Sequence, residues 1–411
     1  MFYHMLAGVF DLNWKFRDWS RPIPSPALVN PDRLDTDQWL AAAQAIGAKY
    51  AVLVVKHCDG FCFWQTDLYP YGLKQSPWRN GKGDLLAESV RSCEKAGIRP
   101  GIYASTSANG YFNVDNPGLV NRGKGGDETR QREYVQLCEK MMTELWTRYG
   151  DLFEIWFDGG TLPPEMGGPN LAPILAREQP NAIVFQGAPG MVNNIRWVGN
   201  EKGRAPDPCW STIDQISQEG GDRERILAGA PDGRIWAPAE CDVPIRNHAW
   251  DWKPNQENLL YSLDELLTMY DESVGRNCNL LLNANPDNHG EIPAADFARY
   301  VEFGKAIQRR YPEPFATTSG TGTELILDFG TTRRLNHVVL MEDTTYGERV
   351  LQHVVERRRD DASWEPVATG TCVGHKRIHR FAPIEAQALR LRILECKTLP
   401  HLRAFSVGLG E

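Results

Sequence analysis

Apolar runs alternate with amphipathic stretches along the first three quarters of the chain. Runs dense in Val, Leu, Ile and Tyr, such as Tyr50 to Val55, predict buried strands. Stretches with apolar residues at helical spacing lie between them, for example Asp84 to Ala96, which Gly97 ends. Because strand and helix signals alternate, we expect a mainly parallel sheet with right-handed crossovers.

There are about eight strand candidates when a first strand near residues 2–10 is counted, as a (β/α)8 barrel requires. Such a barrel typically needs about 250 residues. This barrel would extend to about residue 312. A doubly wound open sheet is the alternative, but the sequence contains no G-x-G-x-x-G or Walker loop. The other expected strands lie near residues 50–55, 98–105, 152–157, 181–186, 195–198, 236–243 and 278–283, and the expected helices cover 37–46, 84–96, 129–149, 263–274 and 294–307.

The pattern changes around Tyr311 to Pro314, after which short strands are broken by turn residues and no helix is indicated. The strand candidates include residues 325–330 and 336–341. They predict an antiparallel β-sandwich of about 95 residues. We therefore divide the chain into a catalytic barrel at residues 1–312 and a C-terminal sandwich at 313–411. The sandwich is either a carbohydrate-binding module or a structural lid on the barrel.

Composition narrows the partners and the compartment. The net charge is −8 and no block of Lys and Arg stands apart from acidic residues, so we expect neither a nucleic-acid nor a membrane partner. No apolar run approaches the roughly 20 residues of a membrane span. The nine cysteines are odd in number and scattered, which favours reduced thiols and a cytoplasmic location. A periplasmic or secreted protein whose leader has been removed is the alternative, and no feature indicates an oligomeric state.

The expected strand at residues 152–157 ends in a carboxylate, Asp158, followed by Gly159 and Gly160. Parallel α/β folds place their chemistry at the carboxyl ends of strands. The two glycines would let a ligand approach this carboxylate closely. The alternative is that Asp158 caps a loop or the next helix.

Other strand ends of the barrel would bring His57, Glu201 and Glu240 to the same rim, together with several aromatic residues. Carboxylates gathered at one rim without a phosphate loop fit hydrolysis of a glycosidic bond by two acids. A metal site at His57, Cys58 and Asp59 is a competing interpretation, but the set matches common ligand spacings poorly. We therefore expect no metal and no cofactor.

Several motifs carry a specific resemblance. Lys56 to Trp64 reads K-H-C-D-G-F-C-F-W and resembles the K-H-H-D-G-F-x-x-W segment of the α-L-fucosidases, glycoside hydrolase family 29. Glu154 to Gly159 resembles the E-x-W-F-D-G nucleophile strand of that family. Arg196 to Glu201 is similar to the R-W-x-G-N-E segment of the subgroup that cleaves α-1,3/1,4-linked fucose on branched glycans. With further matches at residues 76–84 and 341–350, the resemblance spans nearly the whole chain.

The resemblance implies a retaining exo-α-L-fucosidase that acts on fucosylated oligosaccharides or glycoconjugates by double displacement. Asp158 would be the nucleophile, and Glu201 would be the general acid and then the base. Glu240 would contact the leaving sugar or serve as the acid in place of Glu201. The expected substrate-binding residues are His4, His57, Cys58, Trp64, Tyr103, Trp156, Trp197 and Glu240.

The sequence departs from the family pattern at three places. Cys58 stands where the family usually has a second histidine, so a hydroxyl contact is lost or passes to a weak thiol. The family's H-F-G-x-N segment is missing after His4, and its S-P-W-D segment is missing after Tyr103. These departures leave two alternatives: a non-catalytic or weakly active carbohydrate-binding homologue, and a glycosidase for a related sugar such as galactose.

Overall fold

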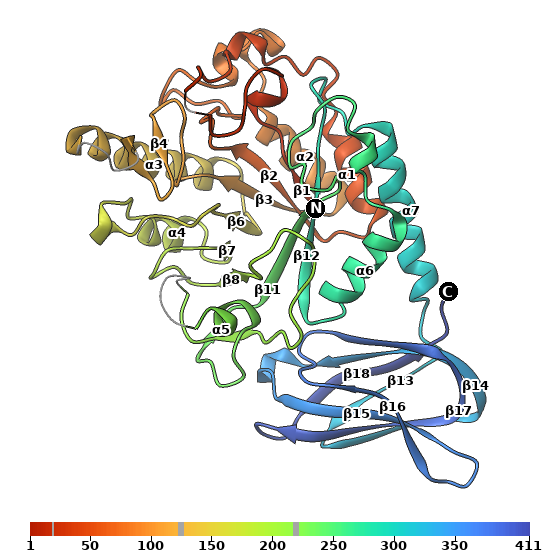
Figure 1. Ribbon diagram of the computed structural model, residues 1–411. Coiled ribbons are helices and arrows are strands. Elements are labelled where there is room, and N and C mark those ends of the chain that lie inside the picture. Colours follow the sequence, from red (N-terminus) through yellow and green to blue (C-terminus); the bar gives the residue numbers. More distant parts are fainter. Residues whose placement is uncertain (19, 122–126, 217–221) are drawn as a thin grey trace. The chain divides into compact units, whose positions relative to one another are not determined.

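The computed structural model describes residues 1–18, 20–121, 127–216 and 222–411. Eight parallel strands close into a barrel in the order β1-β12-β11-β8-β7-β6-β3-β2, and an antiparallel six-stranded sheet follows (Figure 1). The expected fold class is thus confirmed. The barrel strands are β1 (Phe2–Tyr3), β2 (Tyr50–Lys56), β3 (Arg99–Ala104), β6 (Glu154–Trp156), β7 (Ile183–Phe185), β8 (Asn194–Trp197), β11 (Ala239–Pro244) and β12 (Cys278–Ala284).

The described chain gathers into two compact units. The first consists of Met1–Ile195, Pro244–Tyr261 and Leu282–Val301, and the second of Arg196–Val243, Ser262–Leu281 and Glu302–Glu411. The helices are α1 (Thr36–Ala45), α2 (Leu85–Ala96), α3 (Glu128–Arg148), α4 (Ala172–Glu178), α5 (Arg223–Ala228), α6 (Leu263–Ser273) and α7 (Ala294–Arg310). No described helix is both long and apolar enough to cross a membrane.

Side-chain caps fix where the helices begin. The Asp35 carboxylate accepts from the backbone N–H groups of Asp37 and Gln38 at the start of α1, and Asp84 accepts from Ala87 N at the start of α2. These bonds satisfy donors that the first helical turn leaves unpaired. The helix α2 ends at Gly97, whose φ of 66° is left-handed and favours glycine. In the first unit α2 packs on β2 and β3 (Figure 1).

Two expected barrel strands differ from the structure. The first strand covers only Phe2–Tyr3, because a 3-10 helix begins at Ala7, whose N–H donates to the Asp59 carboxylate at 2.9 Å. The strand expected at 236–243 is two strands. Pro238 has no N–H, and it separates β10 (Ile235–Trp236), which pairs with β9 (Thr212–Ile213), from β11.

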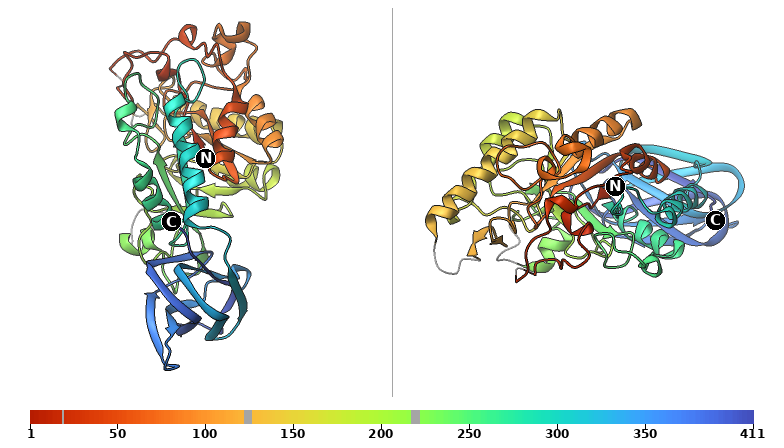
Figure 2. Two further views of the ribbon diagram at one scale, coloured as in Figure 1. Left: turned by 90° about the vertical axis from the view of Figure 1, so that its right-hand side faces the viewer. Right: turned by 90° about the horizontal axis from the view of Figure 1, so that it is seen from above.

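The C-terminal sheet has the strand order β13-β18-β14-β17-β15-β16. The strands expected at 325–330 and 336–341 are one strand, β14, which pairs with β17 along its length. Register shifts between Asp328 and Arg333 and between Leu335 and His337 interrupt this pairing. Such irregularities bend a strand, and Figure 2 shows the sheet curved onto itself. The strands are β13 (Ala316–Thr321), β14 (Glu324–Glu342), β15 (Val350–Arg358), β16 (Trp364–Gly370), β17 (Arg377–Cys396) and β18 (His401–Gly408).

The curved sheet encloses an apolar core that includes Leu335, Leu340 and Phe405, each fully buried. Within the second unit, Glu348 joins this sheet to residues next to the barrel strands. One carboxylate oxygen accepts from Ser211 N at 2.8 Å and the other from Asn277 Nδ2 at 2.6 Å. Asn277 Nδ2 also donates to Cys209 O at 3.0 Å, so Glu348 is part of a buried hydrogen-bond network.

Candidate active site

A column of stacked rings crosses four neighbouring barrel strands of the first unit. His57 follows β2, and its ring is stacked on Tyr103 of β3 with centroids 5.3 Å apart. Tyr103 is stacked in turn on Trp156 of β6 at 5.4 Å, and Trp156 on Phe185 of β7 at 4.0 Å. Strand register explains the column, because Tyr103 pairs with Trp156 and Trp156 with Phe185 across the parallel sheet.

Asp158 lies beside this column, two residues after the end of β6. The Tyr103 hydroxyl donates to Asp158 Oδ2 at 3.1 Å, and the Ser107 hydroxyl donates to the backbone oxygen of Asp158 at 2.6 Å. Phe157 is buried, whereas Asp158 is exposed. Gly159 has a φ of 68°, and a Cβ there would lie only 3.1 Å from Asn116 Nδ2. The carboxylate is therefore held in place and still reachable by a ligand.

Two buried histidines lie near the same rings. Burial lowers the pKa of His57 well below its usual value, and the nearby His4, Lys56 and Arg17 lower it further. Burial also lowers the pKa of His4 to about 4. His4 Nδ1 bonds to Asn283 Oδ1 at 2.8 Å, but the buried His57 Nδ1 has no hydrogen-bond partner in the described part of the chain. Since buried polar atoms are normally paired, His57 Nδ1 is suited to a ligand hydroxyl.

Cys58 is buried beside His57, with apolar neighbours. Its side chain is 4% exposed and packs in an apolar cluster that includes Leu6, Val9 and Trp14. Burial raises the pKa of the thiol well above its usual value. The residue therefore stays a neutral thiol, which is only a weak hydrogen-bond donor.

Asp59 positions the backbone around these residues. Its oxygens accept from Ala7 N and Phe61 N, each at 2.9 Å. Burial raises its pKa to about 6. Asp59 thus joins the segment after β1 to the loop that carries His57 and Cys58.

A second polar cluster lies in the second unit, on β8, β11 and β12. Trp197 Nε1 donates to Asp242 Oδ1 at 2.6 Å, and Asn279 Nδ2 donates to Glu240 Oε2 at 2.8 Å. Glu240 is 1% exposed, whereas Glu201 is exposed in the loop after β8. Burial raises the pKa of Asp242 well above its usual range, and the charges of Glu201 and Glu240 add to this effect. The cluster thus contains Glu240, and the charge of Glu201 acts on it through Asp242.

The sequence places Asp242 in the expected rim segment after the strand, Pro238 to Asp242, without a role of its own, and it does not indicate Asn279. Asp242 lies two residues after Glu240 on the same strand, so the two side chains share one face. That alternation explains why Asp242 belongs to the same cluster as Glu240. Asn279 directly follows the first residue of an expected strand, and nothing in the sequence pairs it with Glu240.

Trp64 is not among the rings around Asp158. Its side chain is fully buried, and Nε1 donates to Glu144 Oε2 on α3 at 3.0 Å. Trp250 does belong to the ring cluster, since its ring centroid is 5.0 Å from that of His4. Phe16, which the sequence analysis missed, has its ring centroid 5.5 Å from that of His57.

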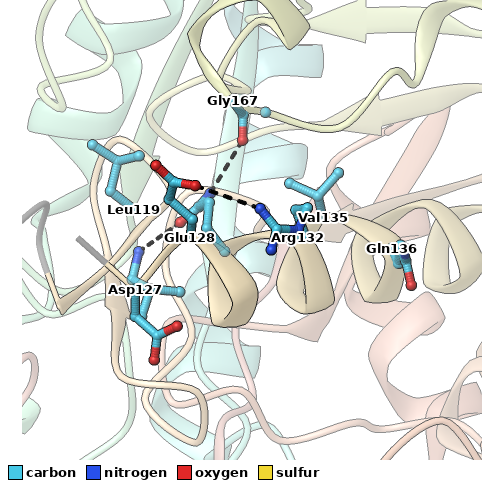
Figure 3. A pocket seen from close by; sticks show the side chains of 10 residues that line it. Leu119, Asp127, Glu128, Arg132, Val135, Gln136 and Gly167 are labelled. Carbon is cyan, nitrogen blue, oxygen red and sulfur yellow. Dashed lines mark hydrogen bonds and ion pairs between the residues drawn. The ribbon is translucent and has the colours of Figure 1, made fainter.

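A hollow of about 460 Å³ lies elsewhere in the first unit, beside the first turns of α3 (Figure 3). Gly167 O accepts from Gln131 Nε2 at 3.2 Å at its edge, and Arg132 pairs with Glu128. None of the predicted site residues lines this hollow. Its lining consists of Leu119, Val120, Asp127, Glu128, Gln131, Arg132, Val135, Gln136, Gly167 and Gly168.

Comparison with known proteins points to one family. The sequence profile of the α-L-fucosidase family matches residues 5–310. The chain is 30% identical to Alpha-L-fucosidase 1 of Arabidopsis thaliana over 97% of this chain and 83% of that protein. A Bacteroides thetaiotaomicron crystal structure, named as a candidate α-L-fucosidase, superposes with a TM-score of 0.93 at 40% identity, covering 99% of this chain and 95% of that one. A glycoside hydrolase 29 family member from an unknown rumen bacterium gives 0.81 at 27% identity, covering 100% and 74%.

Proposed function

Because the chain belongs to the α-L-fucosidase family, glycoside hydrolase family 29, we propose that it removes terminal α-1,3/1,4-linked L-fucose with retention of configuration. The substrate would be a fucosylated oligosaccharide or glycoconjugate. The enzyme class follows from family membership. The linkage, the stereochemical course and the residue roles are our proposal. The hydrogen bond from Tyr103 to Asp158 is the observation that carries the assignment of the nucleophile.

Asp158 is the proposed nucleophile. One of its oxygens attacks the anomeric carbon, the glycosidic bond breaks, and a fucosyl ester forms. The Tyr103 hydroxyl at 3.1 Å orients the attacking carboxylate. Ser107 fixes the backbone at the same residue, which limits the conformations that Asp158 samples before attack.

Glu201 is the proposed acid and base. It protonates the leaving oxygen in the first step and takes a proton from water in the second, and that water attacks the anomeric carbon and releases Asp158. This role requires the two carboxyl groups to approach within about 5–5.5 Å. Exposure of Glu201 supports the assignment, because the acid must reach the leaving sugar. Glu240 is the alternative, although Asn279 already donates to its carboxylate at 2.8 Å.

Fucose is held mainly by neutral groups in this proposal. The unpartnered Nδ1 of His57 and the ring of His4 face sugar hydroxyls. Burial keeps both imidazoles uncharged. The face of Trp250 supplies an apolar wall against which sugar C–H groups pack. Both faces of Trp156 are covered by Tyr103 and Phe185, so Trp156 acts by holding the Tyr103 ring in place. The preference for α-1,3/1,4 linkages rests on the similarity of Arg196 to Glu201 to the corresponding family segment.

Hydrolysis of an aryl α-L-fucoside tests the nucleophile. The wild-type protein should release phenol, Asp158→Ala should lose nearly all turnover, and NMR of the first product should show the α-anomer. Wild-type turnover in Asp158→Ala, or a β-anomer as first product, would contradict the proposal. A screen of α-1,2-, α-1,3-, α-1,4- and α-1,6-fucosylated oligosaccharides then identifies the linkage, with Asp158→Ala as the blank.

Leaving-group dependence tests the acid. Glu201→Ala should slow cleavage of natural glycans far more than cleavage of an aryl fucoside with a good leaving group, because the latter needs little protonation. Glu240→Gln serves as the matched control and should affect both substrates equally. The reverse pattern would transfer the acid role to Glu240.

A further inference from the structure

The segment after the first 3-10 helix reaches the site with two consecutive side chains. The ring of Phe16, although 52% exposed, lies 5.5 Å from the ring of His57. The next residue, Arg17, places Nε 3.0 Å from Asp115 Oδ1, and its Nη2 contacts the same oxygen. Arg17 has a φ of 54°, which costs a non-glycine residue about 1 kcal/mol or more. Such strain is found most often where a side chain is held for function.

The partner of Arg17 belongs to the loop that packs beside Asp158. Asn116, next to Asp115, brings its side-chain nitrogen to 3.1 Å from the position that a Cβ on Gly159 would occupy. Ser107 of the same loop bonds to the backbone of Asp158. Burial lowers the pKa of the Arg17 guanidinium, but Asp115, and to a smaller extent Cys58 and Asp158, more than offset this effect. The contact with Asp115 and the position of Phe16 beside His57 thus place Arg17 next to the proposed fucose site.

Cys58 stands where the family usually has a second histidine, and its buried thiol replaces an imidazole N–H with a weak donor. A guanidinium has five N–H donors, and the ion pair with Asp115 uses only those of Nε and Nη2.

We propose that Arg17 is a substrate-binding residue that donates a hydrogen bond to a fucosyl hydroxyl, in place of the histidine that Cys58 replaces. Phe16 covers the neighbouring edge of the sugar beside His57. The inference rests on the proposed function, since it assigns Arg17 to the same fucose pocket. A loop residue thereby supplies a contact that the barrel strand no longer provides.

Inhibition by free L-fucose measures this contact separately from the chemistry of the leaving group. A hydrogen bond from a charged donor corresponds to about 10- to 100-fold in affinity, so Arg17→Ala should raise the inhibition constant of L-fucose by that factor. Lys15→Ala is the matched control, because it removes the same charge from an exposed position of the same segment. It should change the constant less than about twofold.

The outcomes separate the two proposals. If the wild-type protein hydrolyses fucosides but Arg17→Ala behaves like Lys15→Ala, this inference fails and the proposed function stands. If the wild-type protein neither binds fucose nor cleaves any fucoside, the proposed function fails. If Arg17→Ala folds poorly, Arg17→Lys is the second variant, because it keeps the positive charge but lacks the planar guanidinium. An inhibition constant of L-fucose raised at least tenfold in Arg17→Lys supports the inference, and an unchanged constant refutes it.

Discussion

Glu348 provides the sharpest quantitative prediction about the second unit. Its carboxylate is 3% exposed and receives hydrogen bonds from Ser211 N and Asn277 Nδ2. Burial raises its pKa from 4.5 to about 7, and the charge of Glu342 adds to the shift. The folded protein therefore retains a proton between pH 4.5 and 7 that the unfolded chain has already released. Stability should consequently be full below pH 4.5 and fall as the pH rises to 7.

The shift fixes the size of this effect. The difference of 7 − 4.5 = 2.5 pH units, at about 1.4 kcal/mol per unit, corresponds to about 3 kcal/mol. Glu348→Gln removes the titrating carboxyl group. The new side-chain amide, however, places its N–H₂ group against one of the two donors, Ser211 N or Asn277 Nδ2. That mismatch costs about 1–3 kcal/mol at every pH. The unfolding free energy of the variant minus that of the wild type should therefore rise by about 3 kcal/mol between pH 4.5 and 8.

Urea unfolding followed by circular dichroism across this pH range measures the difference. Glu395→Gln, which alters an exposed carboxylate of the same sheet, is the matched control and should track the wild type at every pH. A constant difference between Glu348→Gln and the wild type would refute the reasoning, because the carboxyl would then titrate alike in both states.

Three further substitutions have defined outcomes. Tyr103→Phe removes the hydrogen bond to Asp158, so kcat/KM for an aryl fucoside should fall about 10- to 100-fold without a change in melting temperature; a fall under twofold would remove Tyr103 from the site. Asp296→Ala leaves the buried Arg246 without its 2.9 Å partner, so the free energy of unfolding in urea should fall by about 3–5 kcal/mol. Glu257→Ala removes a more distant and exposed partner of Arg246, so it should change the free energy of unfolding by under about 0.5 kcal/mol. Gly159→Ala should cost about 1 kcal/mol because the position has a φ of 68°, and it should also lower turnover by crowding Asn116; unchanged melting and activity would contradict both points.

Part of the barrel could be predicted because strands such as Tyr50–Lys56 are continuous apolar runs and helices such as Leu85–Ala96 begin at a capping residue. Tyr50–Lys56 and Leu85–Ala96 differ from the expected bounds by only one residue. The prediction was wrong where tertiary contacts decide. The strand β1 stops after Tyr3 because the segment turns toward Asp59, and a local pattern does not reveal that partner.

The candidate site likewise contains residues that could be predicted from the sequence and residues that could not. Asp158, His57 and Tyr103 could be expected because strand ends have a known place in a barrel. Trp64 lies in the same motif, yet its indole bonds to α3, since the chain has already left the strand end. Arg17 could not be found, because its segment has neither strand nor helix periodicity and its partner Asp115 is 98 residues away. Resemblance to a family also directs attention to shared positions, and Arg17 is not one of them.

The column of rings from His57 to Phe185 has a practical consequence for redesign. Each ring limits the rotation of the next, so substitutions within the column should show strongly non-additive effects. The column also orients the carboxylate at position 158, because Tyr103 is one of its rings and bonds to that carboxylate. Laboratory evolution toward other sugars should therefore vary the loop positions first and leave the column unchanged.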